Sequence, residues 1–188
     1  NGISITGKMS ADFQDVKIEN AEIGIAIENG IADLRNISIE NSAETGLFSK
    51  NSALTVENAS FKNNKSAALR ISNGSDIDIL QANFEQNKIA LVAEANTVIA
   101  LREVSLKDNE IGVLDLGAQL NLIESDIKQN KVGFISENIP TENIKEAVNQ
   151  NEKNFSLETK SVKNSLADAP ENPTASIYTT SIYTGISN

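Results

Sequence analysis

A repeat of about 22 residues governs this chain and limits what it can fold into. In each unit a small residue is followed by a large apolar one, and the last step is shortened to about 21 residues. The pairs are Gly2-Ile3, Gly24-Ile25, Gly46-Leu47, Ala68-Leu69, Ala90-Leu91, Gly112-Val113 and Gly133-Phe134. A fixed period of this length is typical of solenoids, in which every unit packs only on its neighbours. The sequence therefore predicts a stack of similar coils.

Two more apolar series accompany each unit, and in both an apolar residue, one spacer and another apolar residue recur. One series comprises Val16-x-Ile18, Ile37-x-Ile39, Ala59-x-Phe61, Ala82-x-Phe84, Val104-x-Leu106 and Ser125-x-Ile127. The other comprises Leu54-x-Val56, Ile77-x-Ile79, Ile99-x-Leu101 and Leu120-x-Leu122. Alternation with period 2 indicates a strand with one buried face. Each coil is expected to hold three short strands.

Asparagine marks the turns between these strands. It stands at 24 positions, and most of them recur with the period of the repeat. Asn tolerates the left-handed backbone conformation, and stacked Asn side chains can exchange amide hydrogen bonds from coil to coil. We interpret the recurrent residues as structural turn asparagines: Asn20, Asn41, Asn64, Asn87, Asn109, Asn130, Asn29, Asn51 and Asn73.

Two solenoid architectures compete for this repeat. The stretch Leu101–Ile111 fits the leucine-rich repeat template, which places one strand and a convex helix in each unit and serves as a protein-binding solenoid. However, a further apolar pair follows the Asn within a few residues, as in Gly24-Ile25-Ala26-Ile27. This leaves no room for a helix in the unit. Ile, Val and Phe share the inward positions with Leu, as β-propensity favours.

The segment from Val56 to Ile71 carries a resemblance to a known family. Its order of apolar pair, Asn turn, small residue and second apolar pair resembles the repeat of pectate-lyase-like proteins, and the likeness covers roughly residues 2–158. The resemblance implies an all-β fold, a right-handed single-stranded parallel β-helix of about seven coils. That superfamily includes lyases, hydrolases, adhesins and inert spacers, so the resemblance leaves activity open. Among its members, this chain is most similar to a non-catalytic surface or adhesin type.

The repeat also suggests a domain boundary. We assign residues 1–158 to the β-helix, with a degenerate seventh coil that Pro140 interrupts, and residues 159–188 to a C-terminal cap or extended tail. The tail ends in two similar β-prone stretches that could pair with an exposed sheet edge through Ile177, Tyr178, Ile182 and Tyr183. The first residues already match the third strand of a coil, so we expect a fragment of a longer protein or end-to-end assembly.

Composition removes most catalytic chemistries. The chain has no His and no Cys, which excludes an imidazole base, a thiolate nucleophile and a zinc finger. Lyase chemistry needs clustered Asp ligands for calcium and a nearby base, but the three arginines lie at different phases of the repeat. Asp76 and Asp78 are the only candidates for a metal or acid site, and the matching positions in the adjacent coils carry no carboxylate. We therefore predict no catalytic residues, metal or cofactor.

The remaining functions are mechanical or interactive. A net charge of −10 argues against nucleic-acid binding, and no apolar stretch is long enough to span a membrane. We expect a structural or adhesive β-helix module of a secreted or cell-surface protein, which serves as a spacer, adhesin or assembly unit. Its expected partners are another protein, a second copy of itself or a glycan. The alternative is a β-helix that binds or degrades polysaccharide.

Overall fold

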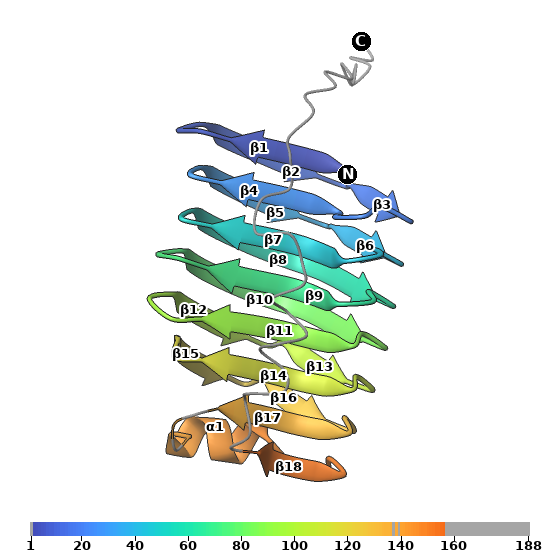
Figure 1. The fold of residues 1–188 in the computed structure, drawn as a ribbon, viewed down its shortest axis with the longest axis vertical. Helices are drawn as coiled ribbons and strands as arrows, with labels where there is room; N and C mark the ends of the chain where they lie inside the picture. Colours follow the sequence, from blue (N-terminus) through green and yellow to red (C-terminus); the bar gives the residue numbers. More distant parts are fainter. Residues whose placement is uncertain (1, 137, 139, 157–188) are drawn as a thin grey trace.

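The structure, a computed structural model, describes residues 2–136, 138 and 140–156. This part of the chain winds into a parallel β-helix of about seven coils with about 22 residues each. Figure 1 shows the coils as layers from β1 at one end to β18 at the other. The predicted all-β fold is confirmed. The leucine-rich repeat alternative is wrong, because each regular coil has further β-strands in the place where the helices of that repeat would lie.

One side of the stack is an eight-stranded parallel sheet to which every coil contributes one strand. Its strands, in spatial order, are β1 (Ile3–Thr6), β4 (Ile25–Glu28), β7 (Thr45–Lys50), β9 (Ala67–Ser72), β11 (Ile89–Glu94), β14 (Ile111–Leu116), β17 (Val132–Ser136) and β18 (Lys153–Ser156). These strands begin near the Gly-Ile type pairs of the repeat. We call this sheet the front sheet.

The other two strands of each coil form the remaining walls. The first of these walls contains β2 (Ser10–Gln14), β5 (Ile31–Arg35), β8 (Ala53–Lys62), β10 (Asp76–Glu85), β12 (Val98–Arg102) and β15 (Gln119–Ile123). The second contains β3 (Lys17–Glu19), β6 (Ser38–Glu40), β13 (Ser105–Lys107) and β16 (Asp126–Lys128), together with the C-terminal parts of β8 and β10. Since β8 and β10 run through the corner, the two walls join into one sheet.

Left-handed residues make the corners of each coil. The predicted Asn20 and Asn41 follow strands of the second wall, and the predicted Asn29, Asn51 and Asn73 follow strands of the front sheet. All five have positive φ. A further series, which the sequence did not reveal, bends the chain between the two walls. Its members are Asp15, Asn36, Asn58, Gln81, Glu103 and Glu124, with φ from 50 to 57°. Only two of the six are Asn, so the recurrence of Asn in the sequence does not identify this corner.

The interior is filled by columns of apolar side chains in register. One column runs the length of the stack through Ile18, Ile39, Phe61, Phe84, Leu106, Ile127 and Val148. Within it the rings of Phe61 and Phe84 stack, with centroids 4.8 Å apart and planes 10° from parallel. Such columns give each coil a close-packed contact with the next, and they account for the period of the sequence.

The seventh coil departs from the sequence prediction. Where an interrupted strand was expected after Pro140, the structure has a short helix, α1 (Glu142–Ala147), which packs against β15. Ile144 and Ala147 of this helix are buried. Thr141 is the N-cap, without a side-chain capping hydrogen bond, and Glu142 places an acidic residue in the first turn, where it favours a helix. The chain then rejoins the stack, where Val148 pairs with Ile127.

The predicted boundary at residue 158 and the tail over residues 159–188 lie outside the described residues. The same is true of the four tail residues predicted to pair with a sheet edge, Ile177, Tyr178, Ile182 and Tyr183. Among the residues that the structure does describe, no helix is long and apolar enough to cross a bilayer.

Candidate functional site

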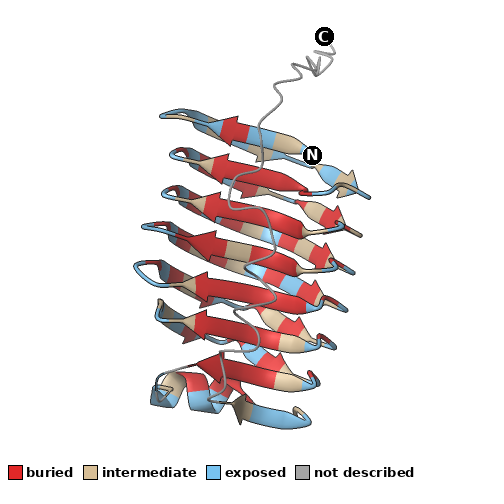
Figure 2. Ribbon diagram, in the orientation of Figure 1, coloured by how far each residue is buried: buried red, intermediate tan, exposed pale blue. Residues whose placement is uncertain are grey.

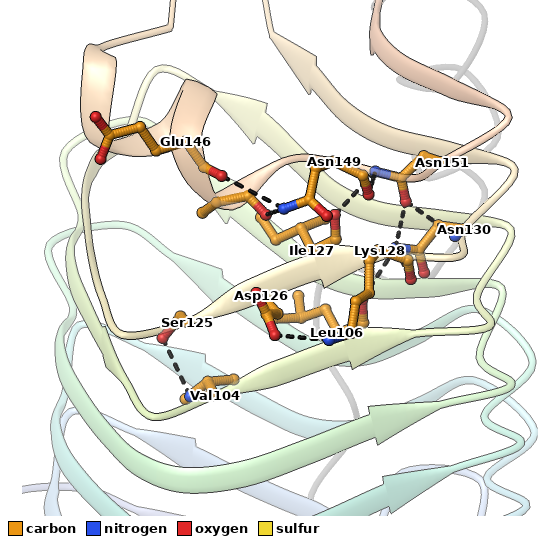
Figure 3. Close-up of polar contacts among 11 residues, drawn as sticks. Val104, Leu106, Ser125, Asp126, Ile127, Lys128, Asn130, Glu146, Asn149 and Asn151 are labelled. Atoms are coloured by element: carbon orange, nitrogen blue, oxygen red, sulfur yellow. Dashed lines mark hydrogen bonds and ion pairs between the residues drawn. The ribbon is translucent and has the colours of Figure 1, made fainter.

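A ladder of buried asparagines follows one corner of the β-helix. It comprises Asn64, Asn87, Asn109, Asn130 and Asn151, one from each of five successive coils. Each Nδ2 donates to the Oδ1 of the next Asn at 2.9–3.0 Å. Four of the five side chains are at most 3% exposed. Figure 3 shows the step from Asn130 to Asn151 near the end of the stack.

The ladder amides from Asn87 to Asn130 use their full hydrogen-bonding capacity, whereas the Oδ1 of Asn64 accepts one hydrogen bond among the described residues, from the Ser42 backbone N–H. The Oδ1 of Asn109, for example, accepts from both the backbone N–H and the side-chain Nδ2 of Asn87. The Nδ2 of Asn109 in turn donates to the Oδ1 of Asn130 and to the carbonyl of Phe84. A primary amide has two donor hydrogens and one acceptor oxygen, so this geometry leaves nothing free for a ligand. The predicted residues Asn64, Asn87, Asn109 and Asn130 therefore join the coils internally.

The ladder does not extend through the first two coils. Ser42 stands in the position of Asn64 one coil earlier, and its backbone N–H donates to the Asn64 Oδ1 at 3.0 Å. The Ser42 hydroxyl is buried and has no hydrogen-bond partner among the described residues. One coil earlier still the position is Ala21. At the other end, Asn154 closes the ladder by accepting from Asn151.

Of the other predicted turn asparagines, Asn41 is half-buried and the remaining four are exposed. Asn51 donates to Asn29 at 2.7 Å across one coil step, and this contact is open to solvent. Asn73 occupies the equivalent turn of the next coil with φ 42°. These residues provide the left-handed conformation, whereas the buried ladder residues each follow a left-handed neighbour such as Asn63 or Gln86. The sequence could not separate these two roles, because both use Asn in turns that recur with the same period.

Asp76 and Asp78 do not form a joint site. Asp76 is exposed, and its strand neighbours are Ala53 and Val98. Asp78 lies 3.3 Å from the guanidinium of Arg102. Among the described residues no group of three or more His, Cys, Asp or Glu side chains could hold a metal ion. The two carboxylates are thus a solvated side chain and one half of an ion pair.

Charged side chains on the walls pair between coils. Lys107 contacts Glu85 at 3.0 Å, and this hydrogen bond, together with the charge of Glu85, raises the pKa of Lys107. Lys131 contacts Glu110 at 3.4 Å. Glu85 is also the strand partner of Lys62 in the preceding coil, but its ion pair is with Lys107. Each pair is of the kind that contributes a few tenths of a kcal/mol, roughly up to 1 kcal/mol.

Asp115 is a buried carboxylate that the sequence did not single out. It stands in β14 and accepts hydrogen bonds from the backbone N–H groups of Gly117 and Ala118 and from the Ser136 hydroxyl, at 2.9–3.0 Å. The Asp-x-Gly spacing before a left-handed glycine is the signal that identifies such a turn. Three donors satisfy the carboxylate, which points to a structural role in shaping the turn.

A shallow polar groove of about 710 Å³ follows the corner that carries the ladder. Its exposed lining includes Lys65, Lys88, Glu110, Lys131 and Glu152. Amide and charged groups of this kind can bind hydroxyl-rich ligands, but no aromatic side chain lines the groove for stacking against a sugar ring.

Comparisons with known proteins include several solved structures of one protein, QnrB1, described as a plasmid-mediated fluoroquinolone resistance protein. A trypsin-treated variant of QnrB1 is 15% identical with a TM-score of 0.23, covering 90% of this chain and 100% of that chain. The full-length form is 14% identical with a TM-score of 0.26, covering 86% of this chain and 98% of that chain. At this level nothing about activity or partners carries over to this chain. Curated protein sequences give no match.

A family model described as a right-handed β-helix region matches residues 1–151. The matched range covers the coils from β1 to Asn151, the last of the five ladder residues. It therefore includes the corners, interior columns and ladder described above. The chain belongs to the right-handed β-helix family.

Proposed function

We propose that this chain is a non-catalytic architectural module, a spacer or assembly unit of a secreted or cell-surface protein, that associates through its N-terminal end. Its interior positions are taken up by apolar columns and by the asparagine ladder, and its wall charges pair with each other. A side chain held by two or three internal contacts is poorly suited to chemistry on a substrate. The arrangement instead suits a stiff body whose ends make the contacts.

The observation that carries this proposal is the exposed end of the apolar interior at the first coil. Ile3, Phe13, Val16 and Ile18 belong to the interior but are only partly buried, whereas the same columns are fully buried two coils later. The edges of β1, β2 and β3 are unpaired on that side among the described strands. Unpaired sheet edges and apolar surface together form a template for another β-structure.

Preceding coils of the same protein or a second copy of the chain could cover this end. Two first coils that meet across a two-fold axis would bury both sets of apolar residues and pair their edges. Such a contact closes on itself and gives a dimer of twice the length. At the opposite end α1 packs against β15 with Ile144 and Ala147 buried, while β18 is an unpaired edge among the described strands.

Sedimentation velocity over a concentration series tests this proposal. We expect the wild-type chain to show a rising weight-average sedimentation coefficient, and Ile18→Lys to remain monomeric because it places a charge in the contact. Glu146→Gln is the matched control, since it makes the same change in net charge on the exposed face of α1. A wild-type chain that stays monomeric up to high concentration, or an Ile18→Lys variant that associates equally well, would refute association through the N-terminal end.

The polar groove supports a second candidate, the binding or degradation of a polysaccharide. It presents amide, ammonium and carboxylate groups along several coils, which is a spacing that a linear glycan can follow. A panel of soluble polysaccharides tests binding by calorimetry, and ultraviolet absorbance of unsaturated products tests lyase activity. Binding that is lost in a Lys88→Ala/Lys131→Ala variant would place the glycan in the groove. Turnover that survives Asp76→Ala and Asp78→Ala would exclude those two residues as its site.

The surface location is also a proposal and has its own test. In the source organism, proteolysis of intact cells should remove the protein while a cytoplasmic marker stays intact. Protection equal to that of the marker would contradict a location at the cell surface, and recovery from the culture medium would support secretion.

A further inference from the structure

The outer face of the front sheet differs from the outer faces of the other walls. Along β12, exposed or half-exposed residues alternate with buried ones, as expected where one face meets water. Along β11, five of six residues are buried. Figure 2 shows the same contrast across the stack, since β7, β9, β11 and β14 of the front sheet are coloured as buried over most of their length. Both faces of the central strands of the front sheet, β7, β9, β11 and β14, are therefore removed from water over most of their length.

One column of outward side chains dominates this face, and we call it the outer stripe. Its members, in register from coil to coil, are Ala26, Phe48, Arg70, Val92, Leu114 and Ile135. The apolar members belong to clusters distinct from the interior core. Val92 and Leu114 are both 0% exposed. A single polar step interrupts the stripe, where Arg70 pairs with Glu94 at 2.8 Å.

No described helix or strand lies over the outer stripe. The main contacts of β11 are with its sheet neighbours β9 and β14, and those of β14 are with β11 and β17. The helix α1 packs against β15, on another wall. Parallel sheets that are apolar on both faces are normally covered by a second layer, because the exposed stripe would otherwise cost about 25 cal/mol for each Å² left in water.

We propose that the chain's own C-terminal segment, residues 157–188, covers the outer stripe. Ser156 ends β18 and continues the same column after Ile135, so the segment leaves the stack directly beside the stripe. The distance from Ser156 to Ala26 is six coil steps, about 29 Å. The 32 residues of the segment, 188 minus 156, can reach about 100 Å when extended. The segment is long enough to cross the whole face.

The composition of the segment matches the surface it would cover. Its large apolar residues are Leu157, Val162, Leu166, Ile177, Tyr178, Ile182, Tyr183 and Ile186. Residues 172–188 contain no Asp, Glu, Lys or Arg, although charged residues make up 22% of the chain. A neutral segment with regularly placed Ile and Tyr can bury apolar area against the stripe without leaving a charge unpaired. A highly charged tail would instead stay in water.

Single-cysteine labelling tests the proposal in the full-length chain, which has no native thiol. In Leu114→Cys, we expect a maleimide to react at least tenfold more slowly than in Val98→Cys, an exposed control on another wall. Adding Ile177→Asp and Ile182→Asp should raise the rate at position 114 at least tenfold and leave position 98 unchanged. Equal rates in the two single-cysteine variants, or a rate at position 114 that ignores the Asp substitutions, would overturn the proposal.

Photo-cross-linking identifies the covering segment directly and does not depend on how well the Asp variants fold. A benzophenone attached to Leu116→Cys, at the border of the stripe, should form cross-links to peptides from residues 157–188. A mixture of isotopically labelled and unlabelled chains shows whether these links lie within one molecule. Links within one chain support the proposal. Links between chains would overturn it in favour of a second copy, and links to added lysate proteins alone would overturn it in favour of a foreign partner.

Discussion

The two ends of the stack follow one repeat but are finished differently. At the first coil Ile18 ends its column half-buried, and the ladder position holds Ala21 and then Ser42. At the last coil Val148 ends the same column fully buried, the helix α1 packs against β15, and Asn151 with Asn154 completes the ladder. The repeat alone thus gives a stack of equivalent coils. Differences at the column position and at the ladder position distinguish the last coil from the first, whose interior is only partly buried and which we call the open end.

The two halves of the stack also differ in the contacts between neighbouring coils. Coils in the C-terminal half are joined by apolar columns and by charge-free amide ladders that leave no donor unused. Coils in the N-terminal half have the columns and separate side-chain contacts, such as Asn51 with Asn29 and Arg35 with Asp12, and the buried Ser42 hydroxyl lacks a partner among the described residues. In a nearest-neighbour stack, local stability should therefore rise from the first coil toward the ladder.

The largest effect should come from truncating one column at its two ends. Ile127→Ala creates a cavity beneath Val148 and should lower the free energy of unfolding by about 2–5 kcal/mol. Ile18→Ala, in the same column, removes a side chain that is already partly in water and should cost about 1 kcal/mol or less. Urea denaturation followed by circular dichroism measures both. Equal losses at the two positions would show that the ends are equally packed.

Breaking the ladder should have the next largest effect. Asn87→Ala leaves the backbone N–H and the Nδ2 of Asn64 without their acceptor in a buried site, with an expected loss of about 2–4 kcal/mol. Asn51→Gly is the control, because it keeps a left-handed residue and removes only an exposed side-chain contact, at a cost of a few tenths of a kcal/mol, roughly 0.5. The same urea titrations apply, and a loss below about 1 kcal/mol for Asn87→Ala would contradict a cooperative ladder.

Extending the ladder should stabilise the weaker half. In Ser42→Asn the new Nδ2 can donate to the Asn64 Oδ1, as the other ladder residues do, and Gly24 holds the position toward residue 42 that Gly46 holds toward Asn64. We expect a gain of about 0.5–1.5 kcal/mol, the usual net value of added hydrogen bonds. Ser66→Asn, in a partly buried turn outside the ladder, should give no gain. A Ser42→Asn chain less stable than wild type would mean that the first coils cannot accept the ladder geometry.

The smallest effect concerns two stacked glutamates near the open end. Burial, and then the charge of Glu22, raise the pKa of Glu44, so ionisation of Glu44 opposes folding. This cost is absent below the ordinary pKa of Glu and is fully present once the pH has risen through the raised value. Glu44→Gln should therefore be more stable than wild type by about 0.5 kcal/mol or less at pH 7 and equal to it near pH 4. Thermal melts at both pH values measure the difference, and an advantage that persists at pH 4 would contradict this cause.

The sequence was sufficient for the fold because the repeat constrains every coil in the same way. Period-2 pairs such as Ile77 and Ile79 identify strands wherever one face is buried, and stacking enforces their register. It could not reveal the corner at Asn58 and Gln81, since that bend falls inside a continuous strand and any residue that tolerates a positive φ can occupy it. The ladder and the exposed turns both use Asn, so only the structure distinguishes their roles.

The sequence was least informative where the repeat ends. A helix replaced the expected strand after Pro140, because the helix buries Ile144 and Ala147 against the stack. The continuous burial of Val92 and Leu114 also escaped notice, since an apolar pair on a strand does not say which face each member takes. For the candidate site, the absence of His and Cys already limited the possible catalytic chemistry in the sequence. The structure added the positions of Asp76 and Asp78.

Hydrogen–deuterium exchange along the stack, at low and high protein concentration, tests the central claim most directly. At low concentration, amides of β1, β2 and β3 should exchange fastest among the strands, and amides of β9 to β14 slowest. At high concentration, protection should rise in β1, β2 and β3 and stay unchanged in β16 to β18. Equal exchange at both ends, or protection at the first coil that does not depend on concentration, would contradict an open end that makes the contacts of this module.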